Sequence, residues 1–284
     1  MNHGKMIKKL RTERRISRKR LVKEIHSIST LQRFENGEAK IDIDSMWLFL
    51  ERMNIQLDEY CLAYHDFQTS KKEELRSRFR KKVIIEEDTL SFLEELESEY
   101  QESGDVFYLY LIIQIKAVTA RMVNNHLETV NEQELNEVYE YLARVECWGY
   151  FELAMYTNCL SLFKGEFRLF NTKDVISQFR KFNSSMKYNY AFIKFLVHSI
   201  ILSFEAGQYT ELPDLLSLLH DTTNDSDFMK GRLYWRFFKR LYQSVTDQYE
   251  FDGSMAVEVF KFLGYDSDVT NLMNIEKIIL EKRE

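Results

Sequence analysis

The chain contains few of the residues that interrupt helices, with one proline and nine glycines among 284 residues. Turns built on glycine and proline are therefore scarce, which argues against sheet-rich folds and against glycine-rich loops that bind phosphate. Hydrophobic residues make up 45% of the chain and charged residues 30%, which excludes a disordered, collagen-like or multi-span membrane protein. We therefore expect an almost entirely helical globular protein.

Cysteine and long apolar segments are also scarce. The three cysteines are odd in number and form no C-x-x-C pair, so neither a disulfide framework nor a zinc site is indicated. The first ten residues contain no apolar signal segment, and Lys194 and His198 interrupt the most apolar stretch, residues 191–204. We expect reduced thiols, a cytoplasmic location and no membrane association.

Common catalytic motifs are absent from the sequence. It contains no G-x-x-x-x-G-K-[ST], G-x-G-x-x-G, H-E-x-x-H or G-x-S-x-G. Asp42 and Asp44 lack the glycine and glutamate spacing of an EF-hand, so this segment is interpreted as a solvated loop rather than a metal site. We therefore expect no enzymatic activity, no metal and no cofactor.

The charge is unevenly distributed along the chain. Residues 1–33 contain eleven Lys and Arg and two Glu, a net charge of +9, whereas the whole chain carries −6 and the remainder therefore −15. Clustered cations displace the counterions of nucleic acids, so the basic segment suggests a polyanionic partner. A solvated basic helix is the alternative interpretation.

Apolar spacing predicts five short helices in a domain at residues 1–66. Ser17 and Ser27 are placed to cap the second and third helices, and Gly37 is placed to end the third. Short helices joined by a tight turn describe a helix-turn-helix domain. The expected helices are one that ends near Arg15, then 18 to about 25, 28–36, 46–53 and 57–63.

The segment Ser27-Ile-Ser-Thr-Leu-Gln-Arg-Phe-Glu-Asn-Gly37 resembles the helix-turn-helix of phage repressors (Xre type). With the flanking residues 16–21 and 53–60, and with a helical remainder of this length, it resembles more narrowly the Rgg/GadR/MutR regulators. The resemblance covers essentially the whole chain. It implies a transcriptional regulator that binds double-stranded promoter DNA and is controlled by a short hydrophobic pheromone peptide in quorum sensing.

The resemblance implies that the third helix enters the major groove, where side chains read base edges by hydrogen bonding. Arg33 is suited to guanine and Gln32 to adenine. Arg18 stands where the motif usually has a phosphate-binding glutamine, and arginine can perform the same role. The predicted DNA contacts are Ile28, Ser29, Gln32 and Arg33 for bases, and Arg14, Arg15, Arg18 and Lys19 for phosphates.

Other positions of the domain are assigned structural roles. The helical spacing places Leu31 and Phe34 in the core, and Ile28 either packs on a thymine methyl group or belongs partly to the core. The resemblance implies an ion pair between Arg11 and Glu35. Some relatives link two DNA-binding domains through a cysteine, but Ser45 occupies that position, so no such covalent link is expected.

After a charged linker at residues 67–74, the pattern predicts helices throughout a domain at residues 75–284. Their pairs repeat about every 35 to 45 residues, the period of tetratricopeptide-like arrays. The predicted fold class is thus all-α, a helix-turn-helix domain followed by a degenerate tetratricopeptide-like superhelix. The expected helices lie near 72–85, 88–102, 105–125, 132–146, 149–163, 172–183, 188–206, 211–220, 226–245, 254–263 and 268–282.

A helical array of this kind presents a concave surface suited to an extended peptide. Most of its aromatic side chains belong in the core, but long polar side chains among them could bond a peptide backbone or carboxylate. The candidates are Arg121, Arg144, Tyr150, Asn158, Arg232 and Arg236.

The last helix, residues 271–283, either caps the array or contacts a second subunit. We expect a homodimer, because two DNA half-sites multiply the limited specificity of one short helix. Two other functions stay open: a protein-binding scaffold without DNA binding, and a DNA-binding regulator without a peptide ligand.

Overall fold

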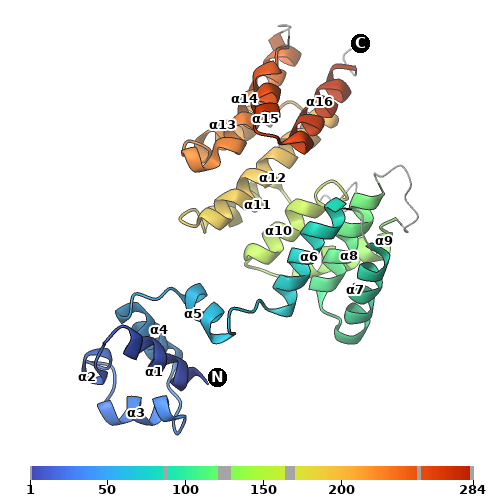
Figure 1. Cartoon of the computed structure of the whole chain (residues 1–284). Coiled ribbons are helices and arrows are strands. Elements are labelled where there is room, and N and C mark those ends of the chain that lie inside the picture. The colour runs from blue at the N-terminus through green and yellow to red at the C-terminus, as the bar shows by residue number, and fades with distance from the viewer. Residues whose placement is uncertain (1, 86–88, 121–128, 164–169, 248–250, 282–284) are drawn as a thin grey trace. The chain divides into compact units, whose positions relative to one another are not determined.

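The computed structural model describes residues 2–85, 89–120, 129–163, 170–247 and 251–281, with the backbone alone at 80–85 and 247. Contacts divide the chain into two compact units, Met1–Ile85 and Glu86–Glu284. The described residues form helices and no strands, which confirms the all-helical prediction (Figure 1). The first unit extends beyond the predicted linker, and the domain boundary at residue 66 stays a prediction.

The first unit contains the five predicted short helices and one longer helix. The second helix is shorter than expected, because the chain turns through Glu24, whose φ is +62°. The fourth begins earlier than expected, because the Asp42 side chain accepts a hydrogen bond from Ser45 N at 2.7 Å and caps it. Asp42 is therefore a helix cap rather than part of a solvated loop. The helices are α1 (His3–Glu13), α2 (Arg18–Leu21), α3 (Ile28–Asn36), α4 (Ile43–Arg52), α5 (Leu57–Tyr64) and α6 (Lys71–Ile85).

The predicted caps of α2 and α3 are confirmed. Ser17 Oγ accepts a hydrogen bond from Arg20 N at 3.2 Å, and Ser27 Oγ accepts one from Thr30 N at 3.1 Å. Gly37 ends α3 in the left-handed conformation, with a φ of +83° that glycine adopts without strain. Both ends of α3 are thus fixed by local sequence.

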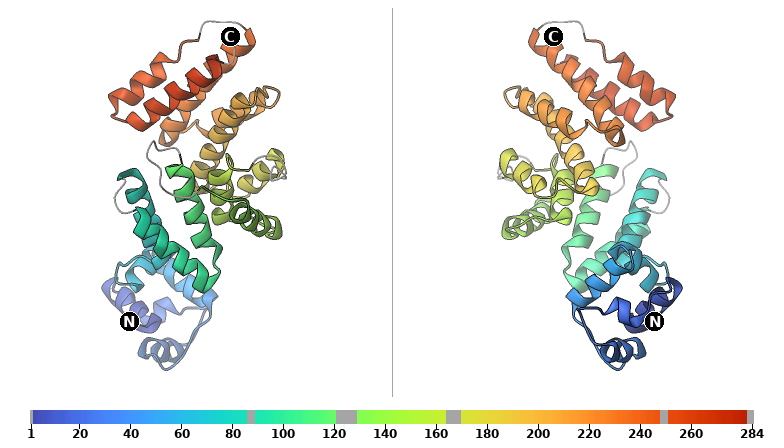
Figure 2. Two further views of the ribbon diagram at one scale, coloured as in Figure 1. Left: turned by 90° about the vertical axis from the view of Figure 1, so that its right-hand side faces the viewer. Right: turned by 90° about the vertical axis from the view of Figure 1, so that its left-hand side faces the viewer.

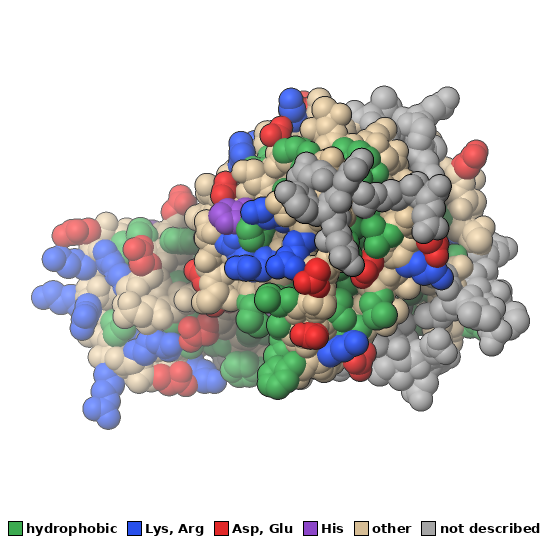
Figure 3. Space-filling view, turned by 90° about the horizontal axis from the view of Figure 1, so that it is seen from above, with side chains coloured by type: hydrophobic (Ala, Val, Ile, Leu, Met, Phe, Trp, Pro, Cys, Tyr) green, Lys and Arg blue, Asp and Glu red, His purple; other side chains and the backbone are tan. Residues whose placement is uncertain are grey.

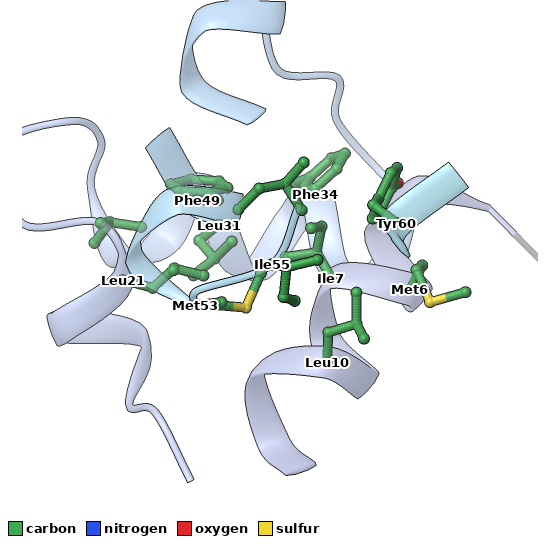
Figure 4. Packing of buried hydrophobic residues seen from close by; sticks show 12 residues of the cluster. Met6, Ile7, Leu10, Leu21, Leu31, Phe34, Phe49, Met53, Ile55 and Tyr60 are labelled. Carbon is green, nitrogen blue, oxygen red and sulfur yellow. The ribbon is translucent and has the colours of Figure 1, made fainter. Parts of the chain in front are cut away.

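The first unit has a hydrophobic core formed by its short helices (Figure 4). Leu31 and Phe34 of α3 are buried in it, as their spacing predicts. Helix α1 crosses α3 at Gly4, where an added Cβ would lie 1.9 Å from the Phe34 carbonyl oxygen. The crossing therefore requires glycine. The buried cluster contains Met6, Ile7, Leu10, Leu21, Val22, Leu31, Phe34, Phe49, Leu50, Met53, Ile55 and Tyr60.

The second unit follows the predicted helices closely. Its α8 ends at Thr119, and the predicted continuation at residues 121–125 lies outside the described residues. Gly104 and Gly207 lie in turns after α7 and α12, with φ values of +63° and +66°. The helices are α7 (Thr89–Ser103), α8 (Val106–Thr119), α9 (Glu132–Arg144), α10 (Tyr150–Cys159), α11 (Thr172–Arg180), α12 (Met186–Glu205), α13 (Leu212–Thr222), η2 (Ser226–Phe228), α14 (Met229–Asp247), α15 (Ser254–Phe262) and α16 (Asp266–Glu281).

Helices of the second unit pack largely against their neighbours in the chain. Contacts join α7 to α8, α8 to α9, α12 to α13 and α13 to α14. At the C-terminal end, α14, α15 and α16 lie side by side (Figures 1 and 2). The assignment to tetratricopeptide-like repeats stays a prediction.

Of the helices in the described part of the chain, none is both long and apolar enough to cross a membrane.

Candidate functional site

Helix α3 lies at one edge of the first unit (Figure 1). The side chains on one of its faces are polar or partly apolar and are exposed. The four residues predicted to contact bases are all exposed, and Asn36 extends the same face. Ile28 is 47% exposed, so about half of its surface is available on this face. The structure therefore brings the predicted base contacts together on one side of one helix. These residues are Ile28, Ser29, Gln32 and Arg33.

The opposite face of α3 is anchored by the buried carboxylate of Glu35. Arg11 Nε donates to Glu35 Oε1 at 2.7 Å, which is the ion pair that the resemblance implies. Arg18 Nε donates to Glu35 Oε2 at 2.7 Å. Burial by itself would raise the pKa of Glu35, but the hydrogen bonds and charges of Arg11 and Arg18 hold it below its usual value. One carboxylate thus ties α1 and α2 to α3.

The four predicted phosphate contacts differ in their surroundings. Arg15 and Lys19 are exposed. Arg14 Nη2 donates to Glu59 Oε1 at 3.1 Å, and Arg18 binds Glu35. Arg18 therefore has a structural partner within the domain, and its contact with phosphate stays a prediction.

Three lysines of α1 form a basic surface that the predicted contacts omit. Lys5, Lys8 and Lys9 line a shallow cavity of about 530 Å³ together with Asn36 at the end of α3. Their i, i+3, i+4 spacing already places them on one helix face, so the signal is present in the sequence. The basic surface thus extends from α3 onto α1.

His26, in the turn before α3, is bonded to the start of α4. Its Nε2 lies 2.8 Å from Ser45 Oγ and 3.6 Å from Asp42 Oδ2. Ser45 is buried. The hydroxyl at position 45 is therefore part of the packing between the turn and α4.

In the second unit, the five described candidates for peptide binding lie in different environments. Arg144 is exposed at the end of α9, and Tyr150 packs edge-on against Tyr188 with its rings 5.6 Å apart. Arg232 Nε donates to the Thr223 carbonyl oxygen at 2.9 Å and thereby satisfies the C-terminal end of α13. The structure thus does not support Arg232 as a free ligand-binding group.

The remaining candidates are Arg236 and Asn158, since Arg121 lies outside the described residues. Arg236 lines a small cavity beside Asp252. The Asn158 side chain donates to the Tyr110 hydroxyl group and accepts from Lys194 Nζ at 2.5 Å. Polar groups of α8, α10 and α12 are thereby joined in a row.

In the sequence, Lys194 stands out only because it interrupts an apolar stretch. In the structure its side chain lines a cavity of about 310 Å³ between α12, α14 and α16. The signal that could have identified it is the same interruption, because a charged residue in an apolar helix needs a polar environment. This cavity adjoins the row of Tyr110, Asn158 and Lys194.

Hydrophobic side chains also reach the surface of the second unit. On the face viewed from above in Figure 3, they lie among charged side chains of both signs. In α15 and α16 and the turn between them, several large apolar residues are more than a third exposed. They are Met255, Phe262, Leu263, Tyr265, Met273 and Ile278.

Two protein-family profiles match this chain. The profile described as "HTH-type transcriptional regulator Rgg, C-terminal domain" matches residues 90–273, and a helix-turn-helix profile matches residues 7–60. Together they cover both units of the structure.

Solved structures with a similar fold include three informative cases. A protein of Listeria monocytogenes EGD-e described as a candidate transcriptional regulator has a TM-score of 0.79 and 17% identity, over 99% of this chain and 97% of that chain. The SHP pheromone receptor Rgg2 of Streptococcus dysgalactiae has a TM-score of 0.73 and 22% identity, over 96% and 98%. The PrgX/cCF10 complex has a TM-score of 0.70 and 14% identity, over 98% and 92%. These likenesses establish a shared fold.

Proposed function

Because this chain belongs to the Rgg family of helix-turn-helix transcriptional regulators, we propose that it binds promoter DNA through α3 under the control of a short hydrophobic peptide. The observation that carries the proposal is the exposed face of α3 with Ile28, Ser29, Gln32 and Arg33. A helix of this kind fits the major groove, where arginine and glutamine recognise guanine and adenine by paired hydrogen bonds.

The surrounding basic groups support the same proposal. Arg15 and Lys19 are exposed on the first unit, and Arg14 and Arg18 keep side chains that are 30% and 32% exposed. Cations at these places would contact phosphates and fix the orientation of the domain on the duplex. The affinity for DNA would then fall steeply with salt concentration.

The peptide part of the proposal rests on the family and on the second unit. Rgg2 is a receptor for SHP pheromone, and PrgX has been solved with cCF10. In this chain, Tyr110, Asn158 and Lys194 supply a polar row across three helices. A peptide with unequal affinity for two arrangements of the protein would shift their populations. If DNA also prefers one arrangement, the peptide and the DNA change each other's affinity by the same factor. Control by a secreted peptide would be a form of quorum sensing.

We further propose that the protein acts in the cytoplasm as a homodimer. The exposed apolar residues of α15 and α16, among them Phe262 at 90% exposure, would be covered by a second copy. Two DNA-binding domains would then occupy two half-sites, which multiplies specificity.

The test is fluorescence anisotropy with duplex DNA from the promoter beside the gene, at two salt concentrations. Replacement of Arg33 by alanine should weaken binding about 5- to 150-fold, because one bidentate contact to guanine is worth roughly 1–3 kcal/mol. Arg180→Ala is the matched control, since Arg180 is likewise exposed in the last turn of a nine-residue helix but lies in the second unit. It should leave binding unchanged.

The same measurement separates the alternatives. Wild-type binding that is absent even at low salt would refute the DNA-binding function and favour a protein-binding scaffold. If the protein binds the DNA but no synthetic apolar peptide changes its affinity for the DNA, a regulator without a peptide ligand is favoured.

A further inference from the structure

Ser199 of α12 is a buried polar residue whose side chain makes no hydrogen bond to the described part of the chain. Ten polar or charged residues are buried there, and the side chains of the other nine all have a partner. Thr119, Thr157 and Ser244 bond back to a carbonyl oxygen of their own helix, as hydroxyl groups inside helices commonly do. Because an unpartnered buried hydroxyl group costs free energy, the exception at Ser199 calls for a partner.

The hydroxyl group of Ser199 is open to a cavity. Among the described residues, no enclosed side-chain nitrogen or oxygen atom lacks a hydrogen-bond partner. The Ser199 oxygen is therefore accessible although the residue is only 9% exposed, and Ser199 lines a cavity of about 620 Å³ between α10, α11, α12 and α13. A volume of this size lies within the range of sites for small molecules. The hydroxyl group is thus available to a ligand in the cavity.

The cavity lies on another side of α10 and α12 than the polar row that includes Asn158 and Lys194. Ser199 follows Lys194 by five positions, which turns its side chain by about 140° around the axis of α12. Tyr156 and Leu160 also line the cavity, and each is two positions from Asn158, a turn of about 200° around the axis of α10. The cavity is therefore separate from the row that supports peptide binding.

The charged groups of the cavity are acidic. Among the described residues that line it, Glu205 and Glu211 are charged, and no lysine, arginine or histidine is present. Glu211 is exposed and forms no ion pair within the described part of the chain. A carboxylate at the wall of a cavity attracts a cation more strongly than one on a convex surface, because less water screens it. The other polar residues of the lining are uncharged: Ser161, Asn171, Thr172, Ser203 and Gln208.

Anions and metal ions fit this cavity less well. The N-terminal ends of α11 and α13 carry partial positive charge. Asn171 caps the first of them by accepting a hydrogen bond from Lys173 N at 2.9 Å, and Glu211 stands at the N-cap of the second. In the described part of the chain, no group of three or more His, Cys, Asp or Glu could hold a metal ion. An organic cation is therefore the favoured ligand.

The cavity also has an apolar wall, to which Leu160, Leu202 and Leu215 contribute. A ligand that fills the space needs carbon groups against these side chains, because the burial of methylene groups on apolar surface is favourable. It also needs N–H donors for the Ser199 oxygen and the Glu211 carboxylate. Aliphatic polyamines have this composition, since methylene segments separate their ammonium groups.

We infer that this cavity binds an aliphatic polyamine, whose ammonium groups bind the Glu211 carboxylate and the Ser199 hydroxyl oxygen while its methylene groups cover the apolar wall. The inference goes beyond the DNA-binding and peptide-binding functions proposed above and depends on neither. Because the cavity borders four helices, a bound polyamine joins neighbouring helix pairs and raises the free energy of unfolding of the second unit.

Isothermal titration calorimetry of the full chain with spermidine at physiological ionic strength tests the site, with the shorter diamine putrescine titrated in parallel. We expect one spermidine to bind per chain. Hexaamminecobalt(III) carries the same charge as spermidine but has no methylene groups. It is expected to bind at least about tenfold more weakly, because it gains nothing from the apolar wall.

Two variants test the residues. Ser199→Ala should weaken spermidine binding roughly tenfold, because an ammonium group loses a hydrogen-bond acceptor. Glu211→Gln should weaken it about fivefold through the loss of an ion pair. The matched controls are Ser244→Ala, at a buried serine of α14, and Glu258→Gln, at an exposed glutamate of α15; neither residue lines the cavity, and both variants should bind as the wild type does.

Circular dichroism of each variant establishes that the helices are intact. Because Glu211 is exposed, its variant tests the site even if Ser199→Ala does not fold. Weaker binding by the site variants with unchanged binding by the controls would support the inference. Spermidine affinity that neither site variant lowers, or that hexaamminecobalt(III) equals, would overturn it, since charge on the acidic surface would then explain the binding.

Failure of both spermidine and putrescine to bind the wild type would also overturn the inference. Water in the cavity would then be the partner of the Ser199 hydroxyl group. Both the DNA-binding and the peptide-binding proposals would stand in that case, because they rest on α3 and on the separate polar row.

Discussion

Arg18, the first residue of α2, binds Glu35 in the last turn of α3 through a hydrogen bond of 2.7 Å. The carboxylate of Glu35 also binds Arg11 of α1. An arginine in the motif's phosphate-binding position is thereby used to hold the domain together. This relationship makes the stability of the first unit depend on one buried charge.

The ion pairs of Glu35 should make the first unit sensitive to acid. Because its folded-state pKa is lowered, the unfolded chain binds a proton first, and stability is lost as the pH falls below about 4.5. Above that pH the contribution is complete. Glu35→Gln should destabilise the first unit by about 3 kcal/mol at pH 7, because Arg11 stays buried without its charged partner. The free energy of unfolding of this variant should also depend less on pH in the acid range than that of the wild type.

Incorporation of 5-fluorotryptophan and ¹⁹F NMR during urea unfolding measure this effect, because Trp47 reports on the first unit and Trp148 and Trp235 report on the second. The exposed Glu38→Gln is the control. If the free energy of unfolding of Glu35→Gln falls with acid as steeply as that of the wild type, other groups cause the acid sensitivity.

Arg18 and Lys19 are neighbours with different expected roles. Arg18→Met should cost roughly 1 kcal/mol of stability, because a hydrogen bond to a charged group is lost, and should also weaken DNA binding. Lys19→Met should weaken DNA binding but change stability by less than about 0.5 kcal/mol, because Lys19 is exposed. Urea unfolding and anisotropy on both variants test this; equal stability losses would contradict the structural role of Arg18.

Ser27 caps the helix that we expect to read DNA. Ser27→Ala should destabilise the first unit by about 1 kcal/mol, because Thr30 N loses its acceptor. Ser27→Asp should restore the stability, since aspartate caps helices equally well. The denaturant midpoint of the Trp47 signal measures both changes. If Ser27→Ala leaves the stability of the first unit unchanged, water must bind the free backbone N–H groups in the first turn of α3.

The three thiols should differ in reactivity. Cys61 and Cys147 are exposed, whereas Cys159 is buried, and burial raises the pKa of its thiol to about 12. Titration with 5,5′-dithiobis(2-nitrobenzoic acid) at pH 8 should therefore modify two thiols quickly and the third only after unfolding. Fast modification of all three in the native protein would contradict the burial of Cys159.

Local features of the first unit could be predicted from the sequence because nearby residues determine them. The Ser27 cap, the Gly37 stop and the spacing of Leu31 and Phe34 fixed both ends of α3 and its buried face. The short α2 was predicted too long, since apolar spacing alone does not indicate the left-handed turn at Glu24.

Contacts between distant helices could not be predicted in the same way. Asn158 was selected for its chemistry, but its bonds to Tyr110 and Lys194 join residues 48 and 36 positions away, and no local pattern determines such pairs. Arg232 was assigned to a ligand, yet it binds a backbone carbonyl at the end of α13, a group that every helix has and that side-chain patterns do not reveal.

The contact of Gly4 with the backbone of Phe34 has a mechanical consequence. Where two helices meet through main-chain atoms, no flexible side chain lies between them to absorb a displacement. We therefore expect a displacement of α1 to be passed directly to α3. A ligand or subunit that moves α1 would therefore also move α3, the helix that we expect to lie in the major groove of DNA.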